Sequence, residues 1–220
     1  MVKIERSFPA PTSLAIQSQN PSVGSYSEAD VIQRLKEDFH NKCYICGLSD
    51  LQDPEVEHLL PHKNRTYPER VFDWNNLFWA CGHCNKVKNQ QKYDVGILDC
   101  CNRDPEDAIS FQLQENEVIV TAKSQNDSKA VLTAMLVEEV FMLKNTPMRD
   151  YKREFRFRKL SEEMNILYDN LEEIKKKPQS KVTMRKLKAL LRRESAFAAF
   201  KRNYVRQHSK QFPQLLQYIA

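Results

Sequence analysis

The residues best suited to chemistry are concentrated between residues 43 and 88 of the 220-residue chain. Two Cys-x-x-Cys pairs frame this stretch, with 34 residues between the second and third cysteines. Four thiolates form a complete tetrahedral set for zinc, so the spacing predicts a structural site with no open coordination position. The predicted zinc ligands are Cys43, Cys46, Cys81 and Cys84.

A second set of polar residues lies within and just after this interval. Glu57 and His58 stand in an apolar run at residues 56–60, which we expect to be a short strand with side chains on alternate faces. Asn76 follows His58 by 18 residues, and Asn85 directly follows the second cysteine pair, where a helix is expected to begin. Such residues could hold a divalent cation through oxygen atoms and activate water through an imidazole.

These residues and their spacing resemble the HNH endonuclease motif over roughly residues 43–89. The resemblance implies a ββα-metal centre that hydrolyses phosphodiester bonds. His58 would be the general base, and Asn76 would brace the loop and orient His58. Glu57 and Asn85 would bind the catalytic cation. Many members of the family have Asp where this chain has Glu57, which leaves the choice between Mg²⁺ and Mn²⁺ open.

Three further residues are candidates for substrate binding, namely His62, Lys86 and Lys88. The two lysines, with Lys92, fall near one face of the predicted metal-binding helix, where they could contact phosphates or form a solvated face. His62 could contact phosphate or be an ordinary loop histidine. His83, inside the second cysteine pair, is expected to be exposed because four thiolates already complete the zinc site.

The pattern along the chain predicts an α+β, helix-rich protein. Its expected parts are an extended N-terminal arm (1–26), a zinc-containing nuclease domain (27–100), a hairpin and helix scaffold (101–143) and a basic helical region (144–220). The arm could wrap its own domain or a partner.

Local signals within these parts predict individual elements. Ser27-x-x-Asp30 resembles a capping box for a helix that leads to the first cysteine pair. Alternation around Glu115-Asn116 predicts a β-hairpin, and apolar periodicity over 128–143 predicts a helix. Pro178 predicts a break between the last two helices.

Charge is distributed unevenly along the chain. Residues 1–143 contain 14 Lys and Arg against 21 Asp and Glu, a net charge of −7. Residues 144–220 contain 20 against 8, a net charge of +12, and the basic residues are interleaved with aromatic ones. This pattern favours nucleic acid as a partner. It is also typical of amphipathic helices whose charged face meets solvent or an acidic protein.

The composition and the cysteine pattern predict a cytoplasmic protein without membrane association. No signal peptide or transmembrane run is evident, since the apolar stretch at 132–143 is interrupted by Glu138 and Glu139. Four of the six cysteines belong to the zinc pattern. Cys100 and Cys101 are expected to be buried small hydrophobic residues rather than a redox site.

A longer resemblance extends beyond the HNH region. Residues 2–6, with Pro9 and Pro11, the Glu-His-Leu-Leu-Pro sequence at 57–61 and the basic helical tail are similar to PtuB subunits of Septu-type and retron-linked bacterial anti-phage systems. This resemblance implies an effector nuclease that works with PtuA, a separate ATPase of the ABC/SMC type, and is restrained until infection. The N-terminal arm and parts of the basic tail would then be candidate surfaces for docking PtuA.

The function expected from the sequence is therefore metal-dependent cleavage of nucleic acid. DNA is the favoured substrate, because activation of water by His58 does not require a 2′-hydroxyl group. RNA, such as transfer RNA, is an alternative substrate for the same enzyme. A non-catalytic zinc-knuckle module that binds nucleic acid or protein is an alternative of a different class.

Overall fold

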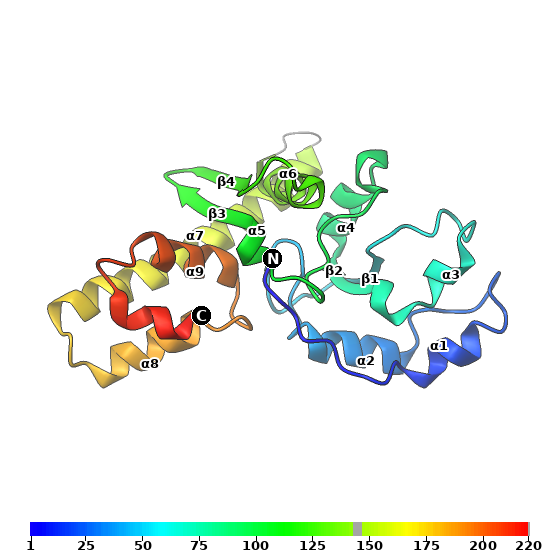
Figure 1. The fold of residues 1–220 in the computed structure, drawn as a ribbon, viewed down its shortest axis with the longest axis horizontal. Coiled ribbons are helices and arrows are strands. Elements are labelled where there is room, and N and C mark those ends of the chain that lie inside the picture. The colour runs from blue at the N-terminus through cyan, green and yellow to red at the C-terminus, as the bar shows by residue number, and fades with distance from the viewer. Residues whose placement is uncertain (143–146, 220) are drawn as a thin grey trace.

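The computed structural model describes residues 1–142 and 147–219 (Figure 1). These residues form an α+β protein that is about half helical and contains two small antiparallel sheets. The predicted fold class is confirmed at this level. Buried apolar side chains form one continuous cluster that extends from Met1 to Ile219.

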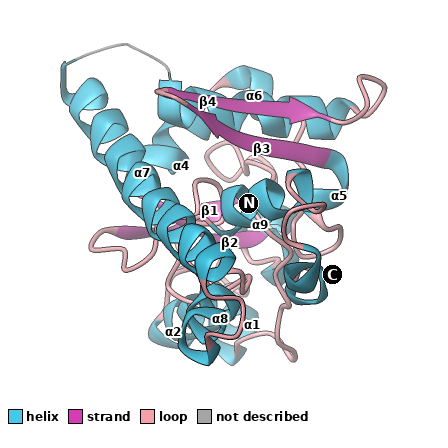
Figure 2. Ribbon diagram, turned by 90° about the vertical axis from the view of Figure 1, so that its left-hand side faces the viewer, coloured by secondary structure: helices cyan, strands magenta, loops and turns pink. Residues whose placement is uncertain are grey.

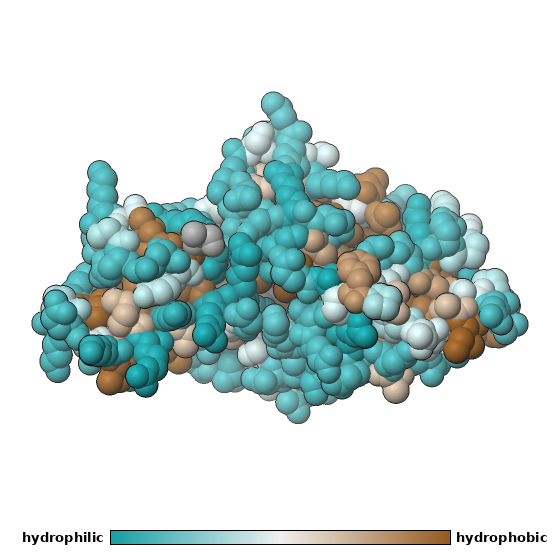
Figure 3. All heavy atoms as spheres, turned by 60° about the horizontal axis from the view of Figure 1, so that its bottom comes forward, coloured by the Kyte–Doolittle hydropathy of each residue, from teal (hydrophilic) through white to brown (hydrophobic). Residues whose placement is uncertain are grey.

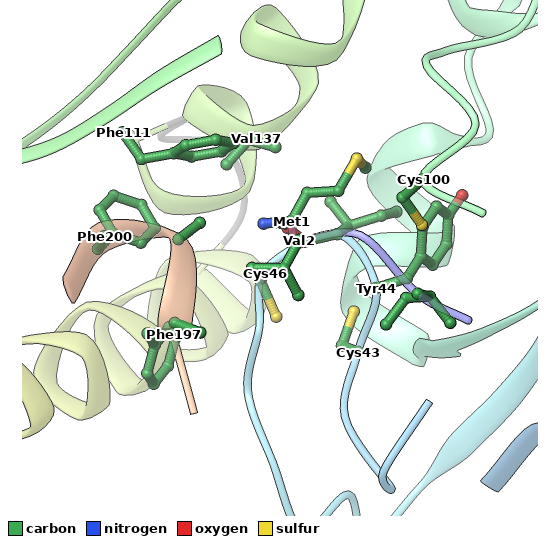
Figure 4. Packing of buried hydrophobic residues seen from close by; sticks show 14 of the residues in the cluster. Met1, Val2, Cys43, Tyr44, Cys46, Cys100, Phe111, Val137, Phe197 and Phe200 are labelled. Carbon is green, nitrogen blue, oxygen red and sulfur yellow. Dashed lines mark hydrogen bonds between the residues drawn. The ribbon is translucent and has the colours of Figure 1, made fainter. Parts of the chain in front are cut away.

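The N-terminal segment packs against the rest of the chain. Ile4 donates its backbone N–H to the carbonyl of Cys100 at 3.0 Å. Arg6 donates to the carbonyl oxygens of Trp74 and Leu77 at 2.7 and 2.8 Å. Figure 4 shows Met1 and Val2 between Phe111, Phe197 and Phe200 on one side and Tyr44 on the other. The first residues of the predicted arm therefore wrap their own domain.

Two helices follow in the N-terminal region, α1 (Thr12–Gln17) and α2 (Ala29–Asp38). The predicted capping box is wrong: Glu28 occupies the N-cap of α2, without a side-chain hydrogen bond. The Asp30 carboxylate instead accepts from the backbone N–H and hydroxyl of Ser13. It joins α2 to the start of α1, a tertiary contact that local spacing does not reveal.

The first sheet pairs β1 (Pro54–His58) with β2 (Leu77–Cys81), and Glu57 lies opposite Phe78. Between the strands lie the short helix α3 (Pro68–Val71) and a 3-10 turn, η1 (Trp74–Asn76). Helix α4 (Gly82–Lys88) follows β2 directly, and η2 (Gln91–Tyr93) comes after it. Two antiparallel strands and a helix are thus adjacent in space and sequence.

The second sheet is the hairpin of β3 (Ile109–Gln114) and β4 (Glu117–Ala122), which follows the short helix α5 (Pro105–Ala108). Helix α6 (Ser128–Met142) packs along β4, as Figure 2 shows. The predicted hairpin is confirmed, and so is the predicted helix as far as Met142. Leu143, the last predicted residue of that helix, lies outside the described residues.

The basic part forms α7 (Pro147–Lys176), α8 (Lys181–Leu190), α9 (Ala198–Gln207) and the 3-10 segment η3 (Pro213–Tyr218). A helix break at Pro178 is confirmed, because α7 ends two residues before it and α8 begins three residues after it. The break does not separate the last two helices, as predicted, because α9 follows α8. The long helix α7 crosses the molecule diagonally in Figure 2 and contacts α6, α8 and α9.

Candidate functional site

The four cysteines of the two Cys-x-x-Cys pairs lie together in one buried group. Their sulfur atoms all lie within 4.8 Å of one another. Zinc–sulfur bonds of about 2.3 Å in a tetrahedron place the sulfur atoms roughly 3.8 Å apart. The group of Cys43, Cys46, Cys81 and Cys84 could therefore hold a structural zinc ion. Across residues 1–142 and 147–219, no second set of three or more His, Cys, Asp or Glu side chains forms such a group.

The backbone positions the two cysteine pairs differently. The first pair lies in a tight turn that ends at Gly47, whose φ is +81° and whose N–H donates to the carbonyl of Cys43 at 2.9 Å. A Cβ atom at position 47 would lie 3.1 Å from the Cα of Phe197, so glycine suits this turn on both counts. In the second pair, Cys81 ends β2 and Cys84 lies in the first turn of α4.

Arg156 of α7 adds a positive charge beside the cysteine group. Its residue is 6% exposed, and Nη2 donates to Sγ of Cys81 at 3.0 Å. Nη1 donates to the carbonyl of Lys152 at 2.8 Å, and no described carboxylate forms an ion pair with this guanidinium. A buried guanidinium needs an anionic partner. Its position therefore fits a cysteine group that carries negative charge, as zinc-bound thiolates do.

Hydrogen bonds and burial shift the pKa of Cys81 in one direction and those of Cys43 and Cys84 in the other. Hydrogen bonds from Cys43, and then from Cys46 and Cys84, lower the pKa of Cys81 well below its ordinary value. Burial raises the pKa of Cys43 and of Cys84. Burial would lower the pKa of Arg156, but the negative charge of the cysteine sulfurs outweighs it and the pKa is raised. Negative charge is thus favoured at the sulfur that Arg156 contacts.

Sequence spacing gave no sign of this role for Arg156, which lies 75 residues from Cys81. The alternation of basic and aromatic residues around it instead favoured contact with nucleic acid. In the structure its guanidinium is buried against a sulfur atom.

A cavity of about 750 Å³ lies beside β1 and α4. Residues predicted for catalysis, cation binding and substrate binding line it together, namely Glu57, His58, His62, Asn85 and Lys88. The loop after β1 and the segment after α4 complete the walls. The fold therefore brings most of the second polar set of the sequence to one concave surface.

His58, the last residue of β1, is 8% exposed and lines this cavity. Its Nε2 lies 3.0 Å from the carbonyl oxygen of Val71, which assigns the ring proton to Nε2. Nδ1 has no hydrogen-bond partner in the described part of the chain. Burial lowers the pKa of His58 to about 4, and the charge of Lys88 acts in the same direction. The imidazole is therefore neutral at pH 7, with one nitrogen able to accept a proton.

Two other rings pack around His58. The ring centroids of Tyr26 and His62 each lie 4.6 Å from that of His58, both in edge-on arrangements. His62 accepts the backbone N–H of Arg65 at Nδ1, at 2.9 Å, so its Nε2 carries the ring proton. His62 is thus a half-buried cavity residue rather than a freely solvated one. Tyr26 comes from the predicted arm, and no sequence pattern linked it to this site.

Glu57 is 4% exposed and both of its carboxylate oxygens have protein partners. Oε1 accepts from Nζ of Lys88 at 2.6 Å, and Oε2 accepts from the hydroxyl of Tyr44 at 2.5 Å. Lys88 donates its other two N–H groups to the carbonyls of His58 and Leu59, each at 3.0 Å. The expectation that Lys88 offers a free ammonium to substrate is therefore corrected, because all three of its protons are donated to the protein.

Tyr44 lies inside the first cysteine pair and was not identified from the sequence. Burial, and then the negative charge of Glu57, raise the pKa of Tyr44 well above its ordinary value, so the phenol remains a hydrogen-bond donor. Through this bond, the turn that carries Cys43 and Cys46 also fixes the carboxylate of Glu57.

Asn76 ends η1, immediately before β2, and holds the loop that follows β1. Its Oδ1 accepts from the backbone N–H of Leu60 at 2.8 Å, and its Nδ2 donates to the carbonyls of Leu60 and Arg70, both at 2.9 Å. Arg70 precedes Val71, whose carbonyl fixes His58. The predicted bracing contacts are present, while any effect on His58 passes through the backbone at residues 70–71.

Asn85 lies in α4 and lines the same cavity. Its Nδ2 donates to Oε2 of Glu55 at 2.6 Å, and strand alternation places Glu55 on the same face of β1 as Glu57. Lys86, the next residue, is exposed to solvent. Lys92, grouped with it in the sequence, forms an ion pair with Glu139 of α6.

The donor chemistry beside β1 suits a hard divalent cation. A carboxylate from Glu57 and a carboxamide from Asn85 line one cavity, and oxygen ligands of this kind are the ones that Mg²⁺ prefers. In the structure, however, an ammonium is bonded to Glu57 and a carboxylate to Asn85. A cation held by these two residues would have to replace Lys88 at Oε1 of Glu57.

Two expectations for other residues need correction or refinement. His83 is 6% exposed, not solvent-exposed, because its ring packs toward α6, with Nε2 3.1 Å from the carbonyl of Val140. Cys100 is buried, as expected, whereas Cys101 is half-buried and its sulfur accepts from Arg6 at 3.5 Å.

Many cations of the basic part form internal ion pairs. Arg202 is 2% exposed, and its Nε donates to both carboxylate oxygens of Glu106 at 2.9 and 2.8 Å. Arg206 pairs with the same carboxylate at 2.9 Å, and Lys201 pairs with Glu163 at 2.9 Å. These residues join α9 to α5 and α7. They belong to the core of the fold rather than to a free basic surface.

Comparison with protein-family models and with curated proteins found no match for this chain. Among the helices that the structure describes, none is long and apolar enough to cross a membrane. The site is thus defined by its own geometry: a buried cysteine group that could hold zinc, next to a cavity lined by an imidazole, a carboxylate and a carboxamide.

Proposed function

We propose that this chain is a metal-dependent endonuclease of the HNH type, with a ββα-metal centre, that hydrolyses phosphodiester bonds and acts preferentially on DNA. The observation that carries the proposal is the environment of His58. The ring lines a cavity of about 750 Å³ with Glu57 and Asn85, while Val71 holds one ring nitrogen and leaves the other available. The order of β1, β2 and α4 also supports the proposal.

In the proposed reaction, Nδ1 of His58 takes a proton from water, and the water oxygen forms a bond to phosphorus. The bond between phosphorus and the leaving sugar oxygen breaks, and that oxygen takes a proton from solvent. The carbonyl of Val71 continues to accept from Nε2 and stabilises the imidazolium that forms. Asn76 keeps the loop that carries Arg70 and Val71 in place.

Glu57 and Asn85 would hold the catalytic cation through a carboxylate and an amide oxygen. When bound, Mg²⁺ or Mn²⁺ would neutralise charge on the phosphate and on the leaving oxygen. Lys88 would release Oε1 of Glu57 and keep its bonds to the carbonyls of His58 and Leu59. The half-buried His62 and the exposed Lys86 would contact the phosphate backbone.

We propose the same biological setting that the sequence resemblance implies. The chain would act in the bacterial cytoplasm as the effector of an anti-phage complex, together with an ATPase of the PtuA type. The resemblance at residues 2–6 and 57–61 supports this assignment. Met1, Val2 and Ile4 are buried, so the exposed Phe8, Ile16 and Val23 are the large apolar residues of the arm that could meet such a partner.

A cleavage time course with His58→Ala tests the proposal. DNA and RNA substrates are incubated with and without Mg²⁺, and with and without the ATPase partner. Loss of general-base catalysis is expected to reduce cleavage by roughly 10²–10⁴-fold, with fold and nucleic-acid binding retained. His40→Asn is the matched control, because His40 is exposed and asparagine tolerates its φ of +54°. Cleavage by His58→Ala at the wild-type rate would contradict the proposal.

A non-catalytic zinc-knuckle binding module is the second candidate. It is favoured by the two hydrogen bonds that occupy the Glu57 carboxylate. A binding module would show nucleic-acid or protein binding that His58→Ala leaves unchanged, and no cleavage under any of these conditions. Cleavage confined to RNA would retain the enzyme and change its substrate.

A further inference from the structure

A run of uncompensated positive charge lies at the corner between α7 and α8. Residues 175–193 contain nine Lys and Arg and no Asp or Glu. Arg193 pairs with Asp104 at 2.5 Å, and Lys175 pairs with Glu172 at 2.6 Å. In the described part of the chain, the other seven form no ion pair with a carboxylate. They are Lys176, Lys177, Lys181, Arg185, Lys186, Lys188 and Arg192, all exposed.

Four of these cations form a row along α8 and just past its end. Lys181, Arg185 and Lys188 are separated by four and three residues, so they lie on one face of the helix, and Arg192 follows two residues after the helix ends at Leu190. At a rise of about 1.5 Å per residue, the three cations on the helix span roughly 10 Å. The opposite face carries Thr183, Leu187 and Leu191, which are buried. Packing of α8 on the protein thus turns the row toward solvent.

This row differs from the other cations of the basic part. Arg202 and Lys201 of α9 are buried and paired with carboxylates, so the fold itself explains them. In the described part of the chain no carboxylate pairs with the row on α8, where Lys188 has the ring of Tyr218 as a neighbour at 5.4 Å. Like charges at this spacing repel one another. An external polyanion would remove that repulsion.

The chemistry of the row fits a phosphate backbone better than a membrane or a protein. The large apolar residues Leu187 and Leu191 face inward, and Val182 is the large apolar side chain that α8 exposes. A bilayer would require an unpacked apolar face on this helix. A regular line of flexible, like-charged side chains suits the repeating charge of a nucleic-acid strand, about one per 3.4 Å of duplex axis.

We propose that the row on α8 binds the backbone of duplex DNA at a distance from the cavity beside β1. Figure 1 places α8 toward the left-hand end of the molecule, whereas β1, β2 and α4 lie right of its centre. Figure 3 brings the lower side forward and shows mainly hydrophilic side chains at this end. The choice of DNA rests on the proposed function, in which hydrolysis needs no 2′-hydroxyl group, but binding at α8 does not require His58.

The test compares two triple variants with the same change in charge. Lys181→Gln/Arg185→Gln/Arg192→Gln removes three members of the row. Lys36→Gln/Lys129→Gln/Lys210→Gln removes three exposed lysines on other parts of the surface. Both are made in the His58→Ala background, so that cleavage cannot interfere. Circular dichroism and thermal unfolding confirm that each variant is folded, as expected for exposed positions.

Fluorescence anisotropy with a 25-base-pair DNA duplex over a series of salt concentrations gives the readout. Loss of three phosphate contacts is expected to reduce the slope of log K against log [salt] by about 2.7 and to weaken binding by at least roughly tenfold. The control variant is expected to bind within about threefold of its parent. Equal weakening in both variants would overturn the proposal, because net charge alone would then explain binding.

Parallel titrations separate the other possible occupants of the row. Tighter row-dependent binding to duplex RNA would overturn the choice of DNA. Row-dependent binding to phosphatidylserine vesicles or to the ATPase partner, without duplex binding, would overturn nucleic acid as the occupant. Row-dependent binding of duplex DNA, without any cleavage by the wild-type chain, would support the row while the proposed nuclease function failed, so the two failures are distinguishable.

Discussion

The cysteine group and the cavity beside β1 share α4 and are joined by the bond from Tyr44 to Glu57, yet they balance their charges in different ways. In the cysteine group, four sulfur atoms converge, and the nearest charged partner is the cation Arg156. In the cavity, the predicted ligands Glu57 and Asn85 are each bonded to a charged side chain of the protein. The first group is arranged for a positive ion, whereas in the second the Glu57 carboxylate already has a cation of the protein, Lys88, as its partner.

The difference indicates how each region depends on a metal. Burial favours the neutral thiol at Cys43 and Cys84 in the absence of metal, whereas zinc would bind all four residues as thiolates and draw them together. Binding of the ion by this group would therefore contribute directly to folding. The Glu57 carboxylate already accepts hydrogen bonds from Lys88 and Tyr44, so the cavity can form without a divalent cation. Metal should therefore control folding in one region and activity in the other.

The largest expected effect follows from removal of zinc. Chelation, or Cys84→Ser, should abolish the cooperative unfolding transition, because zinc binding by such sites is worth on the order of 10–16 kcal/mol. Circular dichroism during a thermal scan, with zinc content measured in parallel, provides the check. Cys101→Ser is the control, since Cys101 lies outside the group and is half-buried. A cooperative transition at the wild-type temperature in zinc-free protein would contradict this account of the cysteine group.

The next effect concerns the ion pair beneath the cavity. Lys88→Met should destabilise the protein by about 3–5 kcal/mol, because it leaves the buried carboxylate of Glu57 without its cation. Urea unfolding measures the loss, and Glu57→Gln combined with Lys88→Met should recover most of it. Lys86→Met, two residues earlier and exposed, should change stability by no more than about 0.5 kcal/mol. Equal effects of the two lysine substitutions would show that the pair is not structural.

A smaller effect is expected at the arginine beside the cysteines. Arg156→Ala should weaken zinc binding about 10–100-fold, because the outer partner of a ligand sulfur is lost. Competition with a chromogenic chelator at pH 7 measures the affinity. Arg156→Lys should retain part of it through charge alone, whereas Arg158→Ala, on the exposed side of the same helix, should retain all of it. Unchanged zinc affinity in Arg156→Ala would show that the contact between Arg156 and Cys81 contributes to packing and not to zinc binding.

How well each of these two regions could be predicted depends on how far apart in the sequence the interacting residues lie. Spacing identified the four cysteines because their types and intervals define a tetrahedral site. The turn at Glu115-Asn116 and the break at Pro178 were likewise visible, because local backbone preferences set them. Arg156 was missed as a partner of Cys81, since nothing local marks a contact across 75 residues.

The sequence predicted which residues line the cavity, but not which of them bond to one another. Glu57, His58 and Asn85 were found from their spacing, and the fold brings them to one cavity. That Lys88 is buried while Lys86 is exposed depends on which face of α4 meets β1, a choice that a helix of seven residues does not encode clearly. The bond between Asp30 and Ser13 shows the same limit, because the Asp30 carboxylate accepts from a tertiary donor, Ser13, instead of forming the expected cap.

The smallest expected change in stability is that of Asn85→Ala. This variant also tests whether the cavity, in contrast to the cysteine group, can lose its metal without unfolding. Asn85→Ala removes one half-exposed hydrogen bond to Glu55 and should cost only about 0.5–1.5 kcal/mol. If Asn85 is a ligand, the variant should also lose on the order of tenfold in Mn²⁺ affinity. The upward shift in melting temperature on addition of Mn²⁺ to zinc-loaded protein reports that affinity through mass action. Asn89→Ala, in the wall of the same cavity, should keep the wild-type shift. An unchanged shift in Asn85→Ala would place the divalent cation elsewhere and leave the cavity with the internal ammonium of Lys88 alone.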